Sequence, residues 1–174
     1  MRKVNKHLLF IAFIVIIAAI LLFMIKKDSQ QNETNPVLYS ITDRSKGNLL
    51  INNHMLKVEI VNTPSSIIQG LSGRTEIGSD GMLFVLPERR QGNFWMKDML
   101  FDLDFVWIKN SRVVDLHENI AAPSKIGFEE DINRIRTDQY VDLVLELPAG
   151  KIKELQIQRG QSVKTLANDK FQPS

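Results

Sequence analysis

Four side chains in the middle of the sequence are of types that often bind ligands. Trp95 and Lys97 are two residues apart, so in a strand they would share one face. Tryptophan offers a flat stacking surface, and lysine donates hydrogen bonds to a carboxylate or phosphate. Arg74 can make a two-point contact with a carboxylate, either a ligand's or that of Asp104. We therefore predict a site at Arg74, Trp95, Lys97 and Asp104, suited to a sugar or an anionic peptide end.

A structural role for the same residues stays open. Large aromatic side chains mostly serve packing, so Trp95 could lie under a loop while Lys97 pairs with Asp98 or Asp104. Arg74 and Asp104 could equally form a strut between the first helical region and a sheet.

Carboxylates provide the second candidate chemistry. Asp102 and Asp104 would lie on one strand face with their Cα atoms ~6.5–7 Å apart, and paired carboxylates can divide acid and base roles in glycoside hydrolysis. A solvated strand face explains the pair as well. Because no complete catalytic set is visible, we assign no catalytic residue.

Metal and cofactor chemistry has little support in the sequence. Asp115 and His117 alternate on a probable strand, but two ligands do not make a metal site. The chain has no cysteine, its serines lack a G-x-S-x-G context, and there is no glycine-rich phosphate loop. We expect neither a metal nor a cofactor.

The N-terminal segment predicts a membrane anchor. Residues 8–25 form an uncharged apolar run of 18 residues, ~27 Å long as a helix, which is close to the thickness of a bilayer core. No small-x-small cleavage site follows it, so we expect an uncleaved signal anchor over 1–27. Three basic residues precede the run and two follow it, which predicts a cytoplasmic N-terminus and an extracytoplasmic C-terminal domain.

Charge excludes nucleic acid as the expected partner. The chain has 22 basic and 20 acidic side chains, but five of the basic ones and none of the acids lie in 1–27. The remainder therefore has 17 basic and 20 acidic side chains, a net charge of −3. Such a domain has no general attraction to phosphate backbones.

The remainder predicts a polar tether over 28–46, a β domain over 47–165 and a flexible tail over 166–174. Apolar alternation, turn pairs and prolines predict short helices at 64–72 and after Pro148, a loop over 119–138, and strands at 49–51, 54–61, 82–86, 93–97, 101–108, 112–117 and 141–147. In the last of these strands Asp142 and Glu146 alternate with the apolar residues. The fold class is mainly β: a compact antiparallel β sandwich or barrel with two short helices, preceded by one N-terminal transmembrane helix.

Four motifs together resemble the family known as domain of unknown function 192: GLSGR from Gly70, GMLF from Gly81, FWMKDMLFDLDFVWI from Phe94 and VLELPAG from Val144. The resemblance implies a compact β fold in proteins that are typically secreted or membrane-anchored, and it implies no reaction. Four positions depart from the family pattern, which has Met, Asn, Thr and Pro where this chain has Ser72, Asp98, Met99 and Asp102.

These observations favour a non-catalytic binding or accessory module at the cell envelope, held to the membrane by its N-terminal helix and facing an envelope glycan, peptide or protein. A second hypothesis is a hydrolase of envelope polymers with Asp98, Asp102 or Asp104 as acid or base. A cleft that contains a carboxylate of raised pKa would favour this hypothesis over a binding module. A third is a structural partner of another membrane protein, which predicts an exposed apolar patch near Phe94, Met99 or Trp107.

Overall fold

The computed structural model describes residues 16–17, 41–123 and 134–166. The chain divides into two compact units, Met1–Pro36 and Val37–Ser174. Except for Ile16 and Ile17, the predicted anchor over 8–25 lies outside the described residues, as do 28–40 of the predicted tether and 167–174 of the predicted tail. Within the described ranges, no helix has the length and apolar character needed to span a bilayer.

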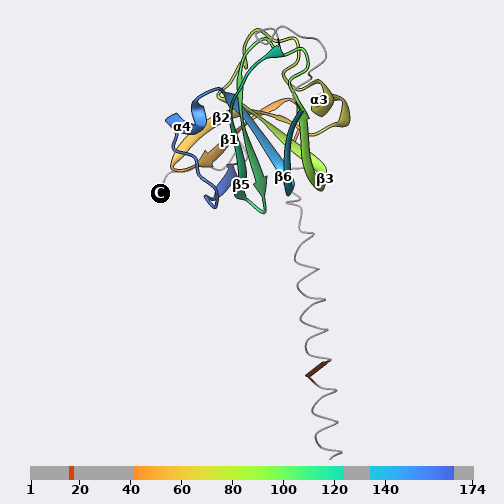
Figure 1. Cartoon of the computed structure of the whole chain (residues 1–174), viewed down its shortest axis with the longest axis vertical. Coiled ribbons are helices and arrows are strands. Elements are labelled where there is room, and N and C mark those ends of the chain that lie inside the picture. Colours follow the sequence, from red (N-terminus) through yellow and green to blue (C-terminus); the bar gives the residue numbers. More distant parts are fainter. Residues whose placement is uncertain (1–15, 18–40, 124–133, 167–174) are drawn as a thin grey trace, which may run out of the picture. The chain divides into compact units, whose positions relative to one another are not determined.

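The second unit is built on one seven-stranded sheet with two short helices, which confirms a mainly β fold (Figure 1). The strand order is β5-β4-β6-β3-β2-β1-β7. The first strand begins inside the segment predicted as a tether. The elements are β1 (Ser45–Ile51), β2 (His54–Val61), α3 (Pro64–Gln69), β3 (Gly81–Trp95), β4 (Leu103–Lys109), β5 (Arg112–Ile120), β6 (Arg134–Pro148), α4 (Lys151–Glu154) and β7 (Val163–Leu166).

Local sequence signals define the hairpins and the first helix as predicted. Asn52 and Asn53 have φ values of 45° and 62° and connect β1 to β2, because asparagine tolerates left-handed backbone. A tight turn likewise joins the antiparallel pair β4 and β5. Thr63 caps α3, with its side chain accepting from the Ser66 amide, and Pro64 begins the helix.

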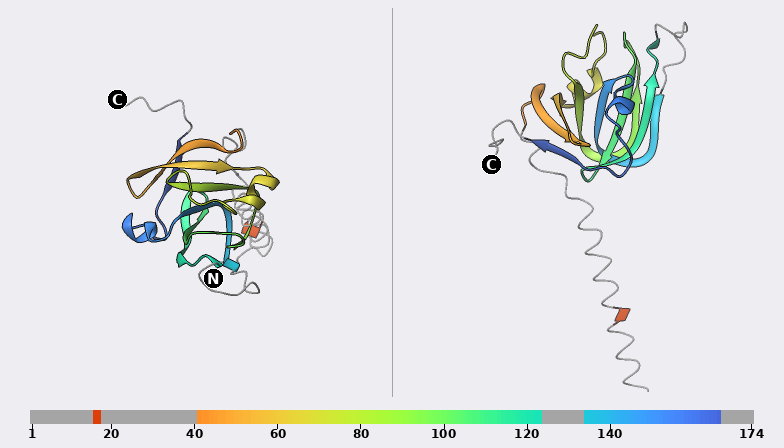
Figure 2. Two further views of the ribbon diagram at one scale, coloured as in Figure 1. Left: turned by 90° about the horizontal axis from the view of Figure 1, so that it is seen from above. Right: turned by 90° about the vertical axis from the view of Figure 1, so that its left-hand side faces the viewer.

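The expected antiparallel sandwich or barrel is correct only in part, and the sheet departs from it in two respects. First, β2 and β3 are parallel, because α3 and the loop after it carry the chain back to the start of the sheet. Second, a single curled sheet replaces two stacked ones (Figure 2). It curls far enough for β5 to meet the segment before β7: the Val113 amide donates to Gln161 O, and the Val163 amide donates to Ser111 O. The result is a half-barrel.

Two long strands make this curling possible. The predicted strand 82–86 and the first part of the predicted strand 93–97 belong to β3, which ends at Trp95 and pairs with β6 near both of its ends. The register shifts between Val85 and Arg90 and again between Gln91 and Asn93, and such bulges bend a strand and increase its twist. Pro87 lies within the first of these register shifts, where its missing N–H costs no bond of the β3–β6 ladder. The predicted loop over 119–138 is wrong at both ends, because β5 continues to Ile120 and β6 begins at Arg134; residues 124–133 lie outside the described ranges.

The sheet is buried on both faces. A first hydrophobic cluster draws on all seven strands and α4, and a second one lies on the opposite face with α3 and the loops. The predicted alternation in β4 is confirmed: Phe105 and Trp107 belong to the second cluster, and Val106 and Ile108 to the first. The expected solvated face at Asp104 is wrong, because this residue is fully buried.

Candidate functional site

A pocket of about 100 Å³ lies on the face of the sheet that α3 covers. By the ~10–15 Å³ that one water needs, it has room for several waters or for one short side chain. Its lining comes from α3 and the residues after it, from both ends of β3, from the turn after β3 and from β6: Ile67, Ile68, Gln69, Gly70, Leu71, Ser72, Phe84, Arg90, Asn93, Phe94, Trp95, Met99 and Glu146.

Glu146 is the buried acid of this pocket. It lies on β6 between Met82 of β3 and Phe105 of β4, which are its register partners, and only 4% of its surface is exposed. Among the described residues, none donates a hydrogen bond or offers a cation to its carboxylate. Burial without compensation raises the pKa of Glu146 to about 8, so the carboxyl group is mostly protonated at neutral pH.

Aromatic side chains form the rigid wall of the pocket. Phe94 meets Phe84 edge to face with ring centroids 5.0 Å apart, and it meets Trp107 in the same way at 5.6 Å. Edge-to-face pairs add stabilisation beyond the buried area. The wall beside Glu146 is therefore apolar and held in place by the core.

The mouth of the pocket is exposed and has both apolar and polar side chains, among them Ile68, which is 64% exposed. Trp95 is 39% exposed, and the Arg134 guanidinium lies 6.0 Å from the centre of its ring. Arg90 and Asn93 are exposed on the same strand. An aromatic surface flanked by hydrogen-bonding groups is a common feature of binding sites.

Two loops that are distant in sequence are fastened together beside the pocket. The Ser72 hydroxyl donates to Lys97 O at 2.9 Å, and the Gly73 amide donates to Asp98 O at 2.8 Å. Gly70 has φ of 48°, a backbone conformation that favours glycine, and a Cβ there would make a tight contact of 3.2 Å with the Phe84 ring. Ser72 and Met99, two of the positions that depart from the family pattern, both line this pocket.

The structure does not bring the four predicted ligand residues together. Trp95 lies at the pocket mouth, as described above. Lys97 is exposed, but β3 ends at Trp95, so the two do not share a strand face. Asp104 is buried in the sheet, where its carboxylate accepts from the Asn119 amide at 2.7 Å and the Ile152 amide at 2.8 Å.

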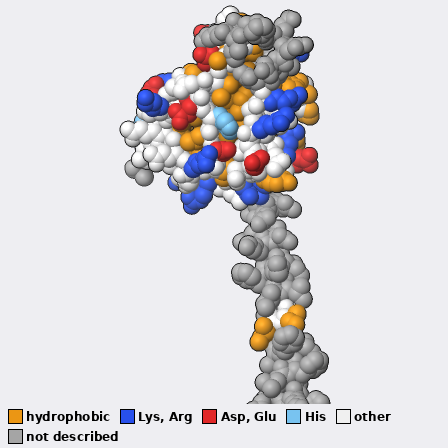
Figure 3. All heavy atoms as spheres, in the orientation of Figure 1, with side chains coloured by type: hydrophobic (Ala, Val, Ile, Leu, Met, Phe, Trp, Pro, Cys, Tyr) orange, Lys and Arg blue, Asp and Glu red, His pale blue; other side chains and the backbone are white. Residues whose placement is uncertain are grey.

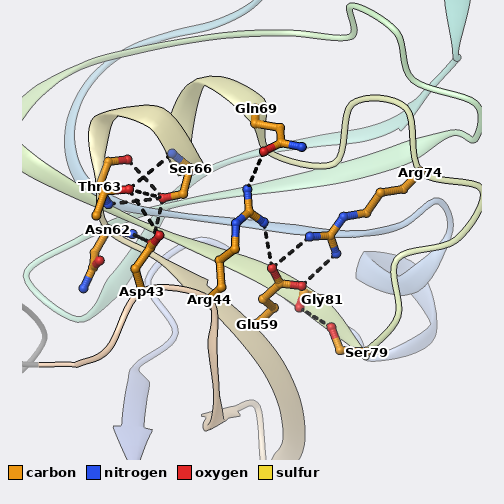
Figure 4. A network of polar contacts seen from close by, with 10 residues as sticks. All are labelled: Asp43, Arg44, Glu59, Asn62, Thr63, Ser66, Gln69, Arg74, Ser79 and Gly81. Atoms are coloured by element: carbon orange, nitrogen blue, oxygen red, sulfur yellow. Dashed lines mark hydrogen bonds and ion pairs between the residues drawn. The ribbon is translucent and has the colours of Figure 1, made fainter.

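Arg74 has a partner other than Asp104. It makes two hydrogen bonds, of 2.7 and 2.9 Å, with the Glu59 carboxylate, which also accepts from Arg44 at 3.0 Å (Figure 4). Arg44 in turn donates to Gln69 at the end of α3. The Arg74 hydrogen bond is the largest cause of the lowered pKa of Glu59. This network ties the loop after α3 to β2. Arg74 therefore forms a structural ion pair, as one of the two predictions had it, but its partner is Glu59 and not Asp104.

The remaining candidates have structural partners. Asp102 accepts from the Ala122 amide at 2.9 Å, while Asp98 is exposed in the turn after β3. His117 accepts from the Trp107 indole at 2.7 Å, and Asp115 accepts from the Thr137 hydroxyl at 2.6 Å. In the described part of the chain, His, Asp and Glu form no group of three placed to hold a metal.

The sequence placed an expected apolar patch near Phe94, Met99 or Trp107. Met99 and Trp107 are buried, so the expected apolar patch is not formed by them; Trp95 and Leu100 are the exposed side chains nearby. On the face shown in Figure 3, basic and acidic side chains are interspersed.

Sequence reasoning missed Glu146. Its alternation with leucines is typical of a solvated strand face, whereas β6 is a central strand covered on both faces. The one available signal was its position inside the VLELPAG motif.

Comparisons with known proteins identify relatives and no activity. The family model described as "Uncharacterized ACR", domain of unknown function 192, matches residues 48–165. A Sinorhizobium meliloti protein proposed to be a transcription regulator is similar in structure, with 29% identity, a TM-score of 0.62, and coverage of 72% of this chain and 98% of its own. A Novosphingobium aromaticivorans protein of unknown function shares the fold at 24% identity, with a TM-score of 0.59 and coverage of 67% and 83%. No curated protein matches this chain.

Proposed function

The chain belongs to the domain of unknown function 192 family, whose biochemical role is not established, and from the geometry of its pocket we propose that it is a non-catalytic binding module. The pocket beside Glu146 is the binding site. It takes one small group of a larger envelope molecule, because about 100 Å³ is too little for a whole sugar chain or peptide.

A single observation carries this proposal: Glu146 is a buried carboxyl without a described partner, and it lies in a pocket that has apolar walls on one side. Burying a polar group without a hydrogen bond costs roughly 1–3 kcal/mol in proteins. A fold that needed only packing at this position would be more stable with an apolar residue. A ligand that hydrogen-bonds to the carboxyl group would offset this cost. Trp95 at the mouth offers such a ligand a stacking surface.

The cell-envelope location is part of the proposal and rests on the sequence. The apolar run over 8–25 and the basic residues on both sides support a single-pass anchor with the β domain outside the cytoplasm. Fractionation of cells producing the full-length chain tests it. Recovery in the membrane after alkaline carbonate washing, with the domain cleaved by protease added from outside, is the expected result. Recovery in the cytosol would contradict it.

Glu146 also favours a second candidate, a hydrolase that uses one acid. A carboxyl with a pKa near neutrality suits a general acid. Hydrolysis of a glycoside needs a second carboxylate, and the described residues that line the pocket include no other. Asp98, Asp102 and Asp104 lie outside this lining. Binding without turnover is therefore the better supported function.

Binding is tested by titrating the full-length chain with a panel of small aliphatic and single-ring compounds and with envelope glycans and peptides. Trp95→Ala should weaken any binding at the pocket mouth at least severalfold. The matched control is Tyr140→Ala, since Tyr140 is an exposed aromatic residue outside the pocket lining. The absence of any compound whose binding depends on Trp95 would refute a binding role for this pocket.

A further inference from the structure

The chemistry of the pocket narrows the class of ligand, provided that the proposed binding function holds. Its walls are formed by Phe84, Phe94 and Met99, and its buried polar group is the carboxyl of Glu146. A ligand that reaches this group contacts these apolar side chains, so an apolar stem suits the pocket. A ligand of the ionised carboxylate must offer hydrogen-bond donors at its inner end, because that form accepts only.

We propose that the pocket binds a cationic group on a short apolar stem, such as the ammonium of an aliphatic amine, with Glu146 as its counter-ion. The ammonium supplies three donors to a carboxylate that has none in the described structure. Charge-assisted hydrogen bonds are the stronger kind, and they gain further in a site that excludes water.

Few other charges act on Glu146. Of the described residues lining the pocket, Arg90 is the only other ionisable one, and it is exposed at the mouth, where solvent screens it. The contributions of α3 are Ile67, Ile68 and Gln69, none of which titrates. On β4, the neighbour of Glu146 is Phe105.

The acid of β4 does not compete for the ligand. Asp104 accepts from the backbone amide of Ile152, a residue of the first hydrophobic cluster on the opposite face of the sheet. The pocket therefore presents one titrating acid to a ligand.

The direction in which affinity changes with pH distinguishes a cationic ligand from an anionic one. A cation binds the ionised form of Glu146, whereas an acceptor such as a carboxylate binds the protonated form, which can donate its O–H. Since the pKa of Glu146 is about 8, amine affinity should rise about tenfold per pH unit from pH 6 to pH 8 and level off above it. Affinity for a carboxylate should fall above pH 8.

The test titrates the full-length chain with n-butylammonium, 1-butanol and butyrate, which share a stem and differ in charge. Calorimetry at pH 8 should give the ammonium a dissociation constant at least tenfold below that of the alcohol. At pH 7, repeating the titration in two buffers of different ionisation enthalpy should show release of close to one proton per ligand. Glu146→Gln should abolish the preference for the ammonium. Glu118→Gln, at an exposed glutamate of β5, should preserve it.

The outcomes separate this inference from the binding function on which it depends. Tighter binding of 1-butanol or butyrate, sensitive to Trp95→Ala, would overturn the cationic ligand and leave a binding pocket. Amine binding that does not change between pH 6 and pH 8 would also overturn it, and this measurement on the unaltered chain needs no variant to fold. Binding of none of the three probes would overturn both.

Discussion

Arg74 and Glu59 form a two-point ion pair that joins the loop after α3 to strand β2. The Arg74 side chain is 30% exposed and that of Glu59 is 14% exposed, so the pair is partly shielded from solvent. It holds one side of the segment that leads into the pocket lining, together with Arg44 and Gln69 (Figure 4). Arg74, which the sequence predicted to bind a ligand, thus helps to hold the loop after α3 in place.

Arg74→Ala should lower the free energy of unfolding by about 1–2 kcal/mol, because a bidentate, partly buried pair is worth more than an exposed one. Urea denaturation at pH 7 measures the change. The pKa of Glu59 is lowered, so its contribution is present above its unfolded pKa of about 4.5 and is lost as pH falls through the folded pKa. The deficit of the variant should therefore shrink below about pH 4. Arg112→Ala, which removes an exposed arginine bonded to Gly160 O, is the control and should cost under ~0.5 kcal/mol.

Glu146→Gln should change how stability depends on pH. The folded pKa of about 8 exceeds the ordinary glutamate pKa of 4.5, so the protonated group contributes fully below pH 4.5, and stability is lost as pH rises toward 8. The slope in this window approaches ~1.4 kcal/mol per pH unit. Chemical denaturation from pH 4 to pH 9 should show this decline in the wild type and in Glu118→Gln but not in Glu146→Gln. Parallel curves for all three proteins would contradict the buried state of Glu146.

Asp104→Ala should destabilise the fold strongly, by roughly 2–4 kcal/mol, because the Asn119 and Ile152 amides would lose their acceptor. Thermal unfolding measures the effect. Asp138→Ala changes an exposed aspartate near the start of β6, and a shift close to zero is expected. Equal stability of the two variants would show that Asp104 does not hold these amides.

Gly92→Ala should be poorly tolerated. A Cβ at this position would lie 2.2 Å from the Trp107 ring and 2.8 Å from the Thr137 methyl group, and the fully buried indole has no free space into which to move. Overpacking of this kind costs about 1–3 kcal/mol. The neighbouring exposed Asn93 provides the comparison: Asn93→Ala should have little effect on the denaturation midpoint. A Gly92→Ala protein as stable as Asn93→Ala would mean that β3 and Trp107 are less closely packed.

Local signals in the sequence determined the elements of the β domain. Asn52-Asn53, Thr63-Pro64 and the alternation over 101–108 predicted a turn, a helix start and a strand, and each was confirmed because turn, capping and pleat preferences act over a few residues. The four motifs identified the family in the same way.

The tertiary structure alone decided which residues meet. Whether the sheet stacks or curls depends on long-range pairing of β3 with β6, and whether Glu146 faces water or a pocket depends on what covers a central strand. The partner of Arg74 was decided in the same way. The sequence shows only that an arginine and several acids are present, and the packed chain places Glu59, not Asp104, within hydrogen-bonding distance of Arg74.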